Sequence, residues 1–221
     1  MVRPPAQLWR VHRGDDPLLV HQARAGTRQH AGPGNRFDSP DGHFGVLYFA
    51  TTLVGCFGEV LARLRPDPVL AQMVARDWKA LGVMAPGQIP RDWRERRNAS
   101  AVHLRGAQEF VDIDALVTHQ VLRTELALGL AALGYQDLDI STVRGPDRRV
   151  TQMISQWAFA ARTEQGQPRF AGLRYQSRLE DDWECWAVFA DTDIEVEQIV
   201  PVSLQMSELQ EVAQTFELTL H

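Results

Sequence analysis

The sequence predicts an α+β protein in which strands form mostly antiparallel sheets flanked by helices. Short apolar segments alternate with amphipathic helical patterns along the first two thirds of the chain. Three apolar, β-prone segments then follow one another closely near the C-terminus, a spacing typical of antiparallel strands. With 221 residues and 44% hydrophobic content, the chain suits one core, so we expect a single domain over residues 1–221.

The N-terminal part predicts a strand, a long loop and a strand-to-helix unit. Residues 8–12 have the pattern of a strand, and residues 13–42 are polar and rich in Gly, Pro and His, as in a functional or mobile loop. Residues 45–50 form an apolar strand candidate. The apolar positions after it, at helical spacing, predict a helix; they are Leu53, Phe57, Val60, Leu61 and Leu64.

The middle of the chain predicts a surface excursion and then a long helix. Residues 66–98 contain several Pro and Gly with many charges, and within them residues 69–81 have an amphipathic helical pattern. Asp114 is a good N-cap for an apolar helix that runs to about residue 133 and is closed by Gly134.

The remaining predicted elements are strands and two further helices. The strands are expected at residues 101–104, 110–113, 170–175, 185–190 and 194–200, and the helices at 148–162 and 207–215.

Composition narrows the class of function. Lys and Arg total 23 against 28 Asp and Glu, a net charge of −5, so we expect no direct nucleic-acid partner. Cys56 and Cys185 have no metal-binding or redox spacing and are expected to be buried free thiols. The N-terminus lacks the pattern of a signal peptide, and no apolar run is long enough for a membrane helix. We therefore expect a cytoplasmic protein without a membrane partner.

Several familiar catalytic motifs are absent. The sequence has no Gly-x-Gly-x-x-Gly, no Walker-type phosphate loop, no His-Glu-x-x-His and no Gly-x-Ser-x-Gly. This disfavours Rossmann redox enzymes, P-loop NTPases, zinc proteases and α/β-hydrolases. The histidines, including His21, His30 and His43, lack metal-site spacing, so we expect no metal.

Three side chains each allow a structural and a functional interpretation. Glu59 faces away from the apolar side of its helix and could pair with Arg63 or act in a site. Tyr48 could be a core tyrosine with a satisfied hydroxyl or a platform for a ligand. Arg36 follows a Gly- and Pro-rich turn and could be a surface residue or aim its planar fork at phosphate oxygens. Spacing alone does not decide between these interpretations.

Taken together, these segments resemble a known family. The runs NRFDSP (35–40), VLYFA (46–50) and GEVL (58–61) resemble the N-terminal core of RES-domain proteins, which are named for an Arg, a Glu and a Ser. TQMISQWA (151–158), FAGLRYQSR (170–178) and ECWAVF (184–189) resemble its C-terminal signature. The resemblance extends from about residue 8 to about residue 200.

The resemblance implies a fold, a chemistry and a partner. RES proteins have a fold similar to ADP-ribosyltransferases, and characterised members are toxins that deplete NAD and are blocked by an Xre-type antitoxin. Matched by motif, the family arginine, tyrosine, glutamate and serine are Arg36, Tyr48, Glu59 and Ser177. Arg10 matches an N-terminal arginine that some members use for phosphates. NAD would be a substrate, and no separate cofactor is expected.

The resemblance also implies a role for each of these residues in cleaving the glycosidic bond of NAD. Glu59 would stabilise positive charge on the ribose, Arg36 and Arg10 would neutralise the diphosphate, Tyr48 would pack on nicotinamide or ribose, and Ser177 would hydrogen-bond the ligand. Water, inorganic phosphate or a protein side chain could accept the ADP-ribosyl group. A module that binds a nucleotide or a partner without turnover stays open as an alternative function. A homodimer is also possible.

Overall fold

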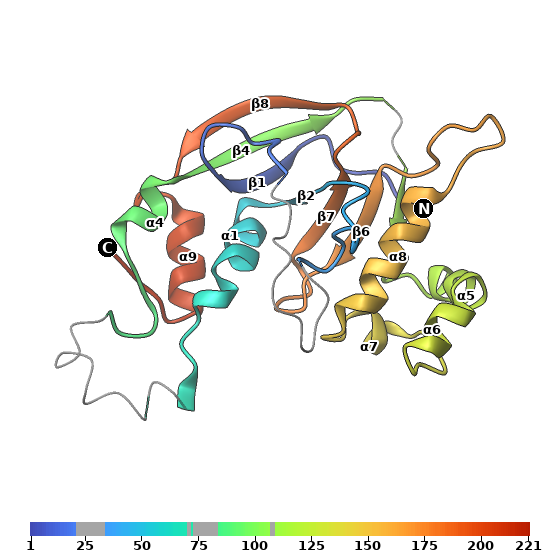
Figure 1. Cartoon of the computed structure of the whole chain (residues 1–221). Coiled ribbons are helices and arrows are strands. Elements are labelled where there is room, and N and C mark those ends of the chain that lie inside the picture. The colour runs from blue at the N-terminus through green and yellow to red at the C-terminus, as the bar shows by residue number, and fades with distance from the viewer. Residues whose placement is uncertain (21–33, 70–71, 73–83, 107–108) are drawn as a thin grey trace.

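A seven-stranded sheet forms the centre of the molecule. The computed structural model describes residues 1–20, 34–69, 72, 84–106 and 109–221. The strands of the sheet are β1 (Leu8–Arg13), β2 (Val46–Ala50), β4 (Arg97–Leu104), β5 (Phe110–Asp112), β6 (Gly172–Gln176), β7 (Glu184–Phe189) and β8 (Ile194–Pro201). Their order is β5-β6-β7-β2-β1-β4-β8 (Figure 1), and every pair is antiparallel except β5 with β6. The predicted α+β class with a mostly antiparallel sheet is confirmed.

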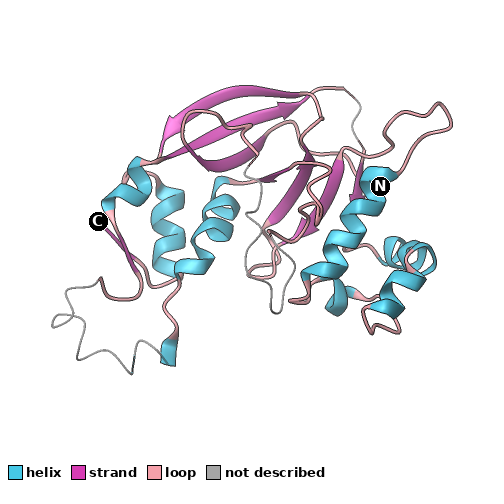
Figure 2. Cartoon of the chain, in the orientation of Figure 1, coloured by secondary structure: helices cyan, strands magenta, loops and turns pink. Residues whose placement is uncertain are grey.

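A second, small sheet and eight helices complete the described residues. The small sheet pairs β3 (Gln88–Ile89) with β9 (Thr219–Leu220) in parallel. The helices are α1 (Leu53–Leu61), the 3₁₀ turn η1 (Ala62–Leu64), α4 (Arg91–Glu95), α5 (Leu116–Glu125), α6 (Ala127–Ala132), α7 (Ile140–Val143), α8 (Arg148–Ala160) and α9 (Ser207–Thr215). They form two groups, α1, α4 and α9 at one end of the sheet and α5 to α8 at the other (Figure 2).

The two faces of the large sheet carry different residues. Side chains alternate along a strand, and residues paired across antiparallel strands share a face. The pairs Trp9 with Ala50, and Tyr48 with Ala187, therefore belong to what we call the helix face, which α1 and α8 cover. Arg10 lies on the opposite, outer face, where its guanidinium carbon stands 5.9 Å from the centre of the Phe49 ring.

Three clusters of buried side chains follow this division. On the helix face, one cluster joins α8 to the centre of the sheet and another joins α1 to α9. A third lies on the outer face, where Leu8, Phe49 and Trp186 pack under Leu18 and Val20. The helix face is thus divided between two helix groups.

The long helix predicted from Asp114 is wrong in its start and in its continuity. Its N-cap is Ala115, and the Asp114 carboxylate instead accepts a hydrogen bond from the backbone nitrogen of Gln176 at 2.6 Å. The backbone leaves helical geometry at Leu126 (φ −108°, ψ 12°), which separates α5 from α6. The bend brings Gly129 against α8, where an added Cβ would stand 2.3 Å from the sulfur of Met153.

The other predicted elements agree with the structure to within a few residues at their ends, except in the 66–98 segment. There, Ile89 and Trp93 are buried between α1 and α9, so the described part contributes to the core, unlike the surface excursion expected. The helix expected at 69–81 lies almost wholly outside the described residues, as do residues 21–33 of the predicted loop. Cys56 and Cys185 are buried free thiols, as expected.

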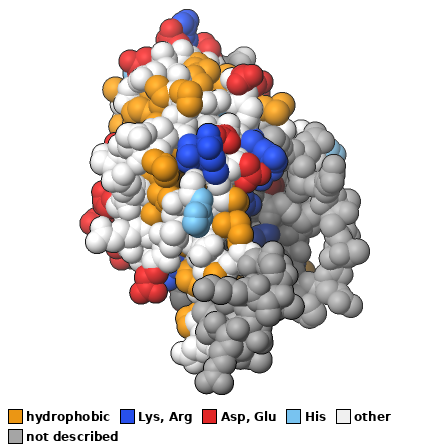
Figure 3. Space-filling model, turned by 90° about the vertical axis from the view of Figure 1, so that its left-hand side faces the viewer, with side chains coloured by type: hydrophobic (Ala, Val, Ile, Leu, Met, Phe, Trp, Pro, Cys, Tyr) orange, Lys and Arg blue, Asp and Glu red, His pale blue; other side chains and the backbone are white. Residues whose placement is uncertain are grey.

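The end of the molecule that carries α4 and the C-terminus displays charges of both signs. Arginine and acidic side chains lie next to one another on this face (Figure 3). On α4, Arg91 pairs with Glu95 at 2.6 Å, and nearby Arg96 pairs with Asp92 at 3.1 Å. Within the described ranges, no helix has both the length and the apolar character that a membrane span requires.

Candidate functional site

Helix α1 holds Glu59 at the surface of the helix face. The Thr52 side chain caps the helix by accepting a hydrogen bond from the nitrogen of Gly55 at 3.1 Å. Phe57 is fully buried on the opposite side of α1, so Glu59 is left exposed. An added Cβ on Gly58 would stand 2.0 Å from the ring of Trp183, which shows that only glycine fits the position before the glutamate.

Ser177 follows β6 directly and meets Glu59. Its backbone nitrogen donates to the carbonyl of Trp183 at 2.9 Å, and its hydroxyl accepts from the nitrogen of Leu179 at 3.1 Å. The same hydroxyl donates to Oε1 of Glu59 at 2.5 Å. The fold thus joins two residues that are 118 positions apart in sequence. None of the ion pairs among the described residues joins Glu59 to Arg63, the partner that spacing suggested.

Arg36 lies in a tight turn that reaches the same face. Gly34 adopts a positive φ of 85°, and the Asp38 carboxylate accepts from the nitrogen of Asn35 at 2.7 Å. The next residue, Phe37, is fully buried in the core beneath α8. With its neighbour anchored in this way, Arg36 cannot swing freely into solvent.

The Arg36 guanidinium lies against a pair of aromatic rings, with part of its hydrogen-bonding capacity unused. Its carbon stands 5.2 Å from the ring centre of Phe37 and 5.3 Å from that of Tyr175. One terminal nitrogen donates to the carbonyl of Val143 at 3.0 Å, whereas the buried Nε has no hydrogen-bond partner among the described residues. Burial lowers the pKa of Arg36, and the charge of Arg178 adds to that effect while Glu59 opposes it. An arginine in this state is prepared to receive an anion.

The Tyr48 hydroxyl is fully engaged with the Arg36 turn. It donates to Oδ1 of Asp38 at 2.7 Å and accepts from the backbone nitrogen of Phe37 at 3.1 Å. Burial raises the pKa of Tyr48 well above its ordinary value, and the neighbouring Asp38 raises it further. The structural interpretation, a tyrosine with a satisfied hydroxyl, therefore describes the observed state, and the residue holds the turn that carries Arg36.

Helix α8 holds the same turn through side chains that spacing did not single out. The Thr151 hydroxyl donates to the carbonyl of Arg36 at 2.5 Å, and the Ser155 hydroxyl donates to that of Phe37 at 2.8 Å. The Gln152 amide donates to the carbonyl of Asn35 at 3.2 Å. All three side chains are buried. The sequence carried one signal for these residues, which was the spacing i, i+1 and i+4 of three polar side chains on one predicted helix.

Tyr175 and Arg178 are two further residues of the site. Tyr175 lies on the helix face of β6, two positions before Ser177, and its ring meets Arg36 there. Arg178 is exposed and close enough for its charge to act on Arg36. Their place beside Ser177 in the run RYQSR was the available signal.

Arg10 does not join these residues. On the outer face, its two terminal nitrogens donate to the carbonyls of Pro17 at 2.5 Å and Leu19 at 3.1 Å. Burial lowers its pKa to about 10, although Asp16 partly offsets the effect. The structure therefore brings together Arg36, Tyr48, Glu59 and Ser177 on the helix face and leaves Arg10 on the other side of the sheet.

Two other features of the described residues lie apart from this group. No cluster of three or more His, Cys, Asp or Glu side chains there could hold a metal ion, and His21 and His30 fall outside those residues. A hollow of about 750 Å³ lies beside α5 and α6 and is lined by side chains between Gln120 and Asp137. None of the predicted site residues lines it.

Comparison with known protein families assigns the chain to one of them. No curated protein matches the chain. Residues 7–211 match the RES domain, a span that includes Arg36, Glu59 and Ser177. Because the match covers nearly the whole chain and the three eponymous residue types meet on one face of the sheet, the chain belongs to the RES domain family.

Proposed function

We propose that this protein is a toxin-like enzyme that consumes NAD by cleaving the bond between nicotinamide and ribose, by hydrolysis or phosphorolysis. Membership of the RES family supports an NAD-related, toxin-like domain in general terms. The observation that carries the specific reaction is the 2.5 Å contact between the Ser177 hydroxyl and the Glu59 carboxylate, within electrostatic reach of the partly unpaired Arg36.

Glu59 has the chemistry that this reaction needs. As the C1–N1 bond breaks, its electron pair leaves with nicotinamide and positive charge develops on the ribose. A carboxylate held next to the anomeric carbon stabilises that charge more in the transition state than in the ground state. Nicotinamide leaves as a neutral molecule, so the leaving group needs no strong acid. Ser177 binds one carboxylate oxygen of Glu59, which fixes its direction and leaves the other oxygen for the sugar.

Arg36 supplies the complementary charge for the diphosphate. Its Nε and the terminal nitrogen not used by Val143 can donate to phosphate oxygens in the planar arrangement that arginine favours. Tyr48 holds the turn through its hydroxyl, so in this proposal its ring rather than its hydroxyl contacts the ligand. NAD is thus bound as a substrate, with no separate cofactor.

Replacing Glu59 by glutamine tests the proposal. Purified protein is incubated with NAD, with and without inorganic phosphate, and nicotinamide is separated by chromatography. We expect Glu59→Gln to lower turnover at least about 100-fold, because the developing charge loses its counter-ion, while NAD affinity changes by less than about threefold. ADP-ribose as co-product would identify water as the acceptor, and a phosphorylated ADP-ribose would identify phosphate.

Glu211→Gln is a matched control, because Glu211 is also an exposed glutamate on a helix, α9. It should cleave NAD at the wild-type rate. Retained turnover in Glu59→Gln would remove Glu59 from the mechanism. Nicotinamide release only when a protein acceptor is added would indicate an ADP-ribosyltransferase. Binding of NAD without release by the wild type would indicate a nucleotide-binding module.

A toxin role would require a partner that controls it, and we propose a protein of the Xre antitoxin type. Expression of the wild type should then stop growth and lower cellular NAD, whereas Glu59→Gln at the same protein level should do neither. An unaffected host that contains active wild-type protein would contradict the toxin role and leave the enzymatic proposal standing.

A further inference from the structure

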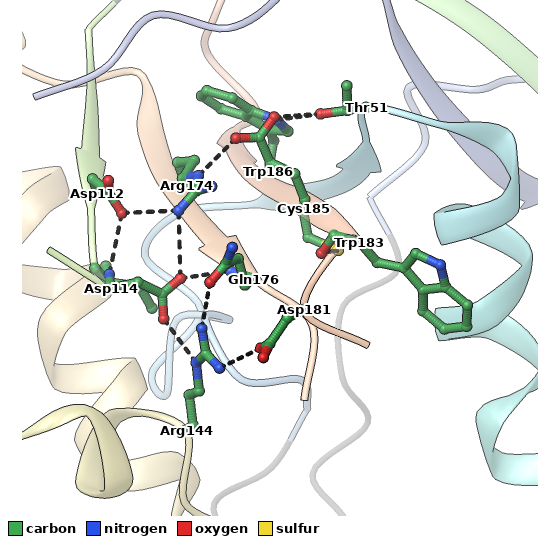
Figure 4. A network of polar contacts seen from close by, with 12 residues as sticks. Thr51, Asp112, Asp114, Arg144, Arg174, Gln176, Asp181, Trp183, Cys185 and Trp186 are labelled. Atoms are coloured by element: carbon green, nitrogen blue, oxygen red, sulfur yellow. Dashed lines mark hydrogen bonds and ion pairs between the residues drawn. The ribbon is translucent and has the colours of Figure 1, made fainter. Parts of the chain in front are cut away.

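Arg144 occupies the first position after α7 and is the centre of a polar network beside the site. Figure 4 shows its guanidinium directed toward Asp114, Gln176 and Asp181. Nε donates to Oδ1 of Asp114 at 3.0 Å, and the terminal nitrogens donate to Oδ1 of Asp181 at 2.8 Å and Oε1 of Gln176 at 2.5 Å. All three nitrogens of one side chain are therefore committed to different segments of the chain.

One end of this network reaches Arg36. The carbonyl of Val143, the residue before Arg144, accepts the hydrogen bond from the Arg36 guanidinium at 3.0 Å. Asp139 caps α7 through the nitrogen of Thr142 at 2.8 Å, so the short helix is fixed at its start by the cap and at its end by Arg144. The position of the carbonyl that holds Arg36 depends on both.

The other end reaches Ser177. Gln176 is the last residue of β6 and precedes Ser177, and its backbone nitrogen donates to Asp114, which also binds Arg144. Asp181 belongs to the turn that returns to Trp183, whose carbonyl accepts from the Ser177 nitrogen. Arg144 thus contacts the chain before and after the serine that orients Glu59.

A second arginine extends the network toward α1. Arg174 donates to Glu184 at 2.8 Å and contacts Asp112 at 3.3 Å, and Glu184 accepts from the hydroxyl of Thr51 at 2.7 Å. Thr51 directly precedes Thr52, the cap of the helix that carries Glu59. Polar contacts therefore run without interruption from α7 across β6 and β7 to the start of α1 (Figure 4).

From these contacts we propose that Arg144 is a positioning residue that sets the spacing between Arg36, where the diphosphate of the substrate binds, and the Ser177–Glu59 pair, where the glycosidic bond breaks. This inference rests on the function proposed above. Arg144 touches neither the substrate nor the reacting atoms. It acts through the carbonyl of Val143 on one side and through Gln176 and Asp181 on the other.

Only the planar fork of arginine can serve three acceptors placed around it. A lysine at this position would keep the charge but offers a single ammonium group, which cannot reach all three acceptors at hydrogen-bonding distance. Arg144 is about one quarter exposed, so its surroundings tolerate the smaller head group. A lysine variant should therefore fold and lose the spacing rather than the charge.

The test compares the steady-state kinetics of NAD cleavage in Arg144→Lys and wild type. We expect kcat to fall about 10- to 100-fold, with KM changed less than about threefold. Displacing the binding groups relative to the reacting groups weakens binding of the transition state more than binding of the ground state. Asp181→Asn removes the charge of one exposed partner of Arg144 without threatening the fold and should lower kcat about threefold in the same way.

Arg123→Lys is the matched control, since Arg123 also pairs with an aspartate, Asp137 at 2.6 Å, but on α5 away from the site. It should leave both kinetic constants unchanged. If Arg144→Lys and Asp181→Asn behave like Arg123→Lys, the positioning role is overturned and the proposed function stands. If they raise KM and leave kcat intact, Arg144 acts in binding and the proposal is likewise overturned. No nicotinamide from the wild type would overturn both proposals.

Discussion

Arg10 and Arg36 are both held in the interior of this protein, on opposite faces of one sheet, and their hydrogen bonds differ. Arg10 donates to the carbonyls of Pro17 and Leu19, so the backbone of the segment that covers it accepts hydrogen bonds from both terminal nitrogens. Arg36 donates to the carbonyl of Val143, and its buried Nε has no partner in the described part of the chain. A buried donor without a partner costs free energy, and such groups persist where function needs them. Hydrogen bonding, rather than residue type, therefore distinguishes a structural arginine from one that can receive a ligand.

The surroundings of the two arginines support the same distinction. Burial lowers the pKa of both, to about 10 for Arg10, yet both stay cationic near neutral pH. Arg36 lies within electrostatic reach of Glu59 and Arg178, two exposed charges that a ligand could also contact. The acidic residue whose charge raises the pKa of Arg10 is Asp16, in the segment that already covers it.

Parallel lysine substitutions would test this comparison most strongly. We expect Arg36→Lys to lower kcat/KM for NAD cleavage about 100-fold, because lysine cannot provide the planar donors that match a diphosphate. Arg10→Lys should change kcat/KM by less than about threefold and lower the free energy of unfolding by about 1 to 2 kcal/mol, because the carbonyls of Pro17 and Leu19 lose their donor.

Steady-state kinetics and denaturant unfolding of both variants provide the measurement. Equal losses of kcat/KM in the two variants would contradict the distinction and assign Arg10 to the substrate, as the resemblance to RES proteins implies. A loss of stability alone in both variants would leave the diphosphate without a partner on either face.

Two buried serines sharpen the same comparison with a smaller effect. Ser155 donates to the carbonyl of Phe37 on the helix face, and Ser100 hydrogen-bonds the ring of His12 on the outer face, each at 2.8 Å. Both are fully buried, so replacement by alanine should lower the free energy of unfolding by about 1 to 2 kcal/mol in each case. We expect only Ser155→Ala to lower kcat as well, about 5- to 10-fold, because it loosens the turn that carries Arg36.

Thermal or denaturant unfolding and NAD cleavage, measured on the same preparations, separate the two effects. A fall of kcat in Ser100→Ala equal to that in Ser155→Ala would mean that stability as such limits turnover. In that case the contacts between α8 and the Arg36 turn would have no special role.

Most helices and strands could be predicted from the sequence, because the spacing of apolar residues within each short segment largely determines them. The apolar spacing from Leu53 to Leu64 lies within one short segment, and helix α1 (Leu53–Leu61) forms over most of it. The predicted helix from Asp114 failed because a nonlocal contact decided it. The Asp114 carboxylate binds Gln176, Arg144 and Arg174 instead of capping a helix.

The candidate site shows the same limit more clearly. Family motifs pointed to Arg36, Tyr48, Glu59 and Ser177, and the fold brings these four together. The pairing of Arg10 with backbone carbonyls could not be foreseen, because it depends on which face of β1 the side chain occupies and on what covers that face. Short polar patterns say which groups a chain offers, and only the packed strands determine which of them meet.

The smallest expected effect concerns the outer face, where His12 lies two positions after Arg10 on strand β1. Burial lowers the pKa of His12 from its ordinary value of 6.5, and the nearby Arg10 adds to this, whereas Asp16 and backbone contacts oppose it. Its Nε2 pairs with the Ser100 hydroxyl, and its buried Nδ1 has no hydrogen-bond partner within the described ranges. Because the unfolded chain takes up a proton that the folded protein resists, stability falls as the pH drops below about 6.5.

We therefore expect the free energy of unfolding to decrease between pH 7.5 and 5.5 in the wild type, by at most about 1.4 kcal/mol through this histidine. His12→Gln keeps a group that can hydrogen-bond Ser100 and removes the proton-binding site, so its decrease over the same range should be smaller by that amount. Urea unfolding at the two pH values measures both slopes. Identical slopes would show that His12 is solvated enough to titrate equally in both states, and the outer face would then be less well sealed than its bonded arginine indicates.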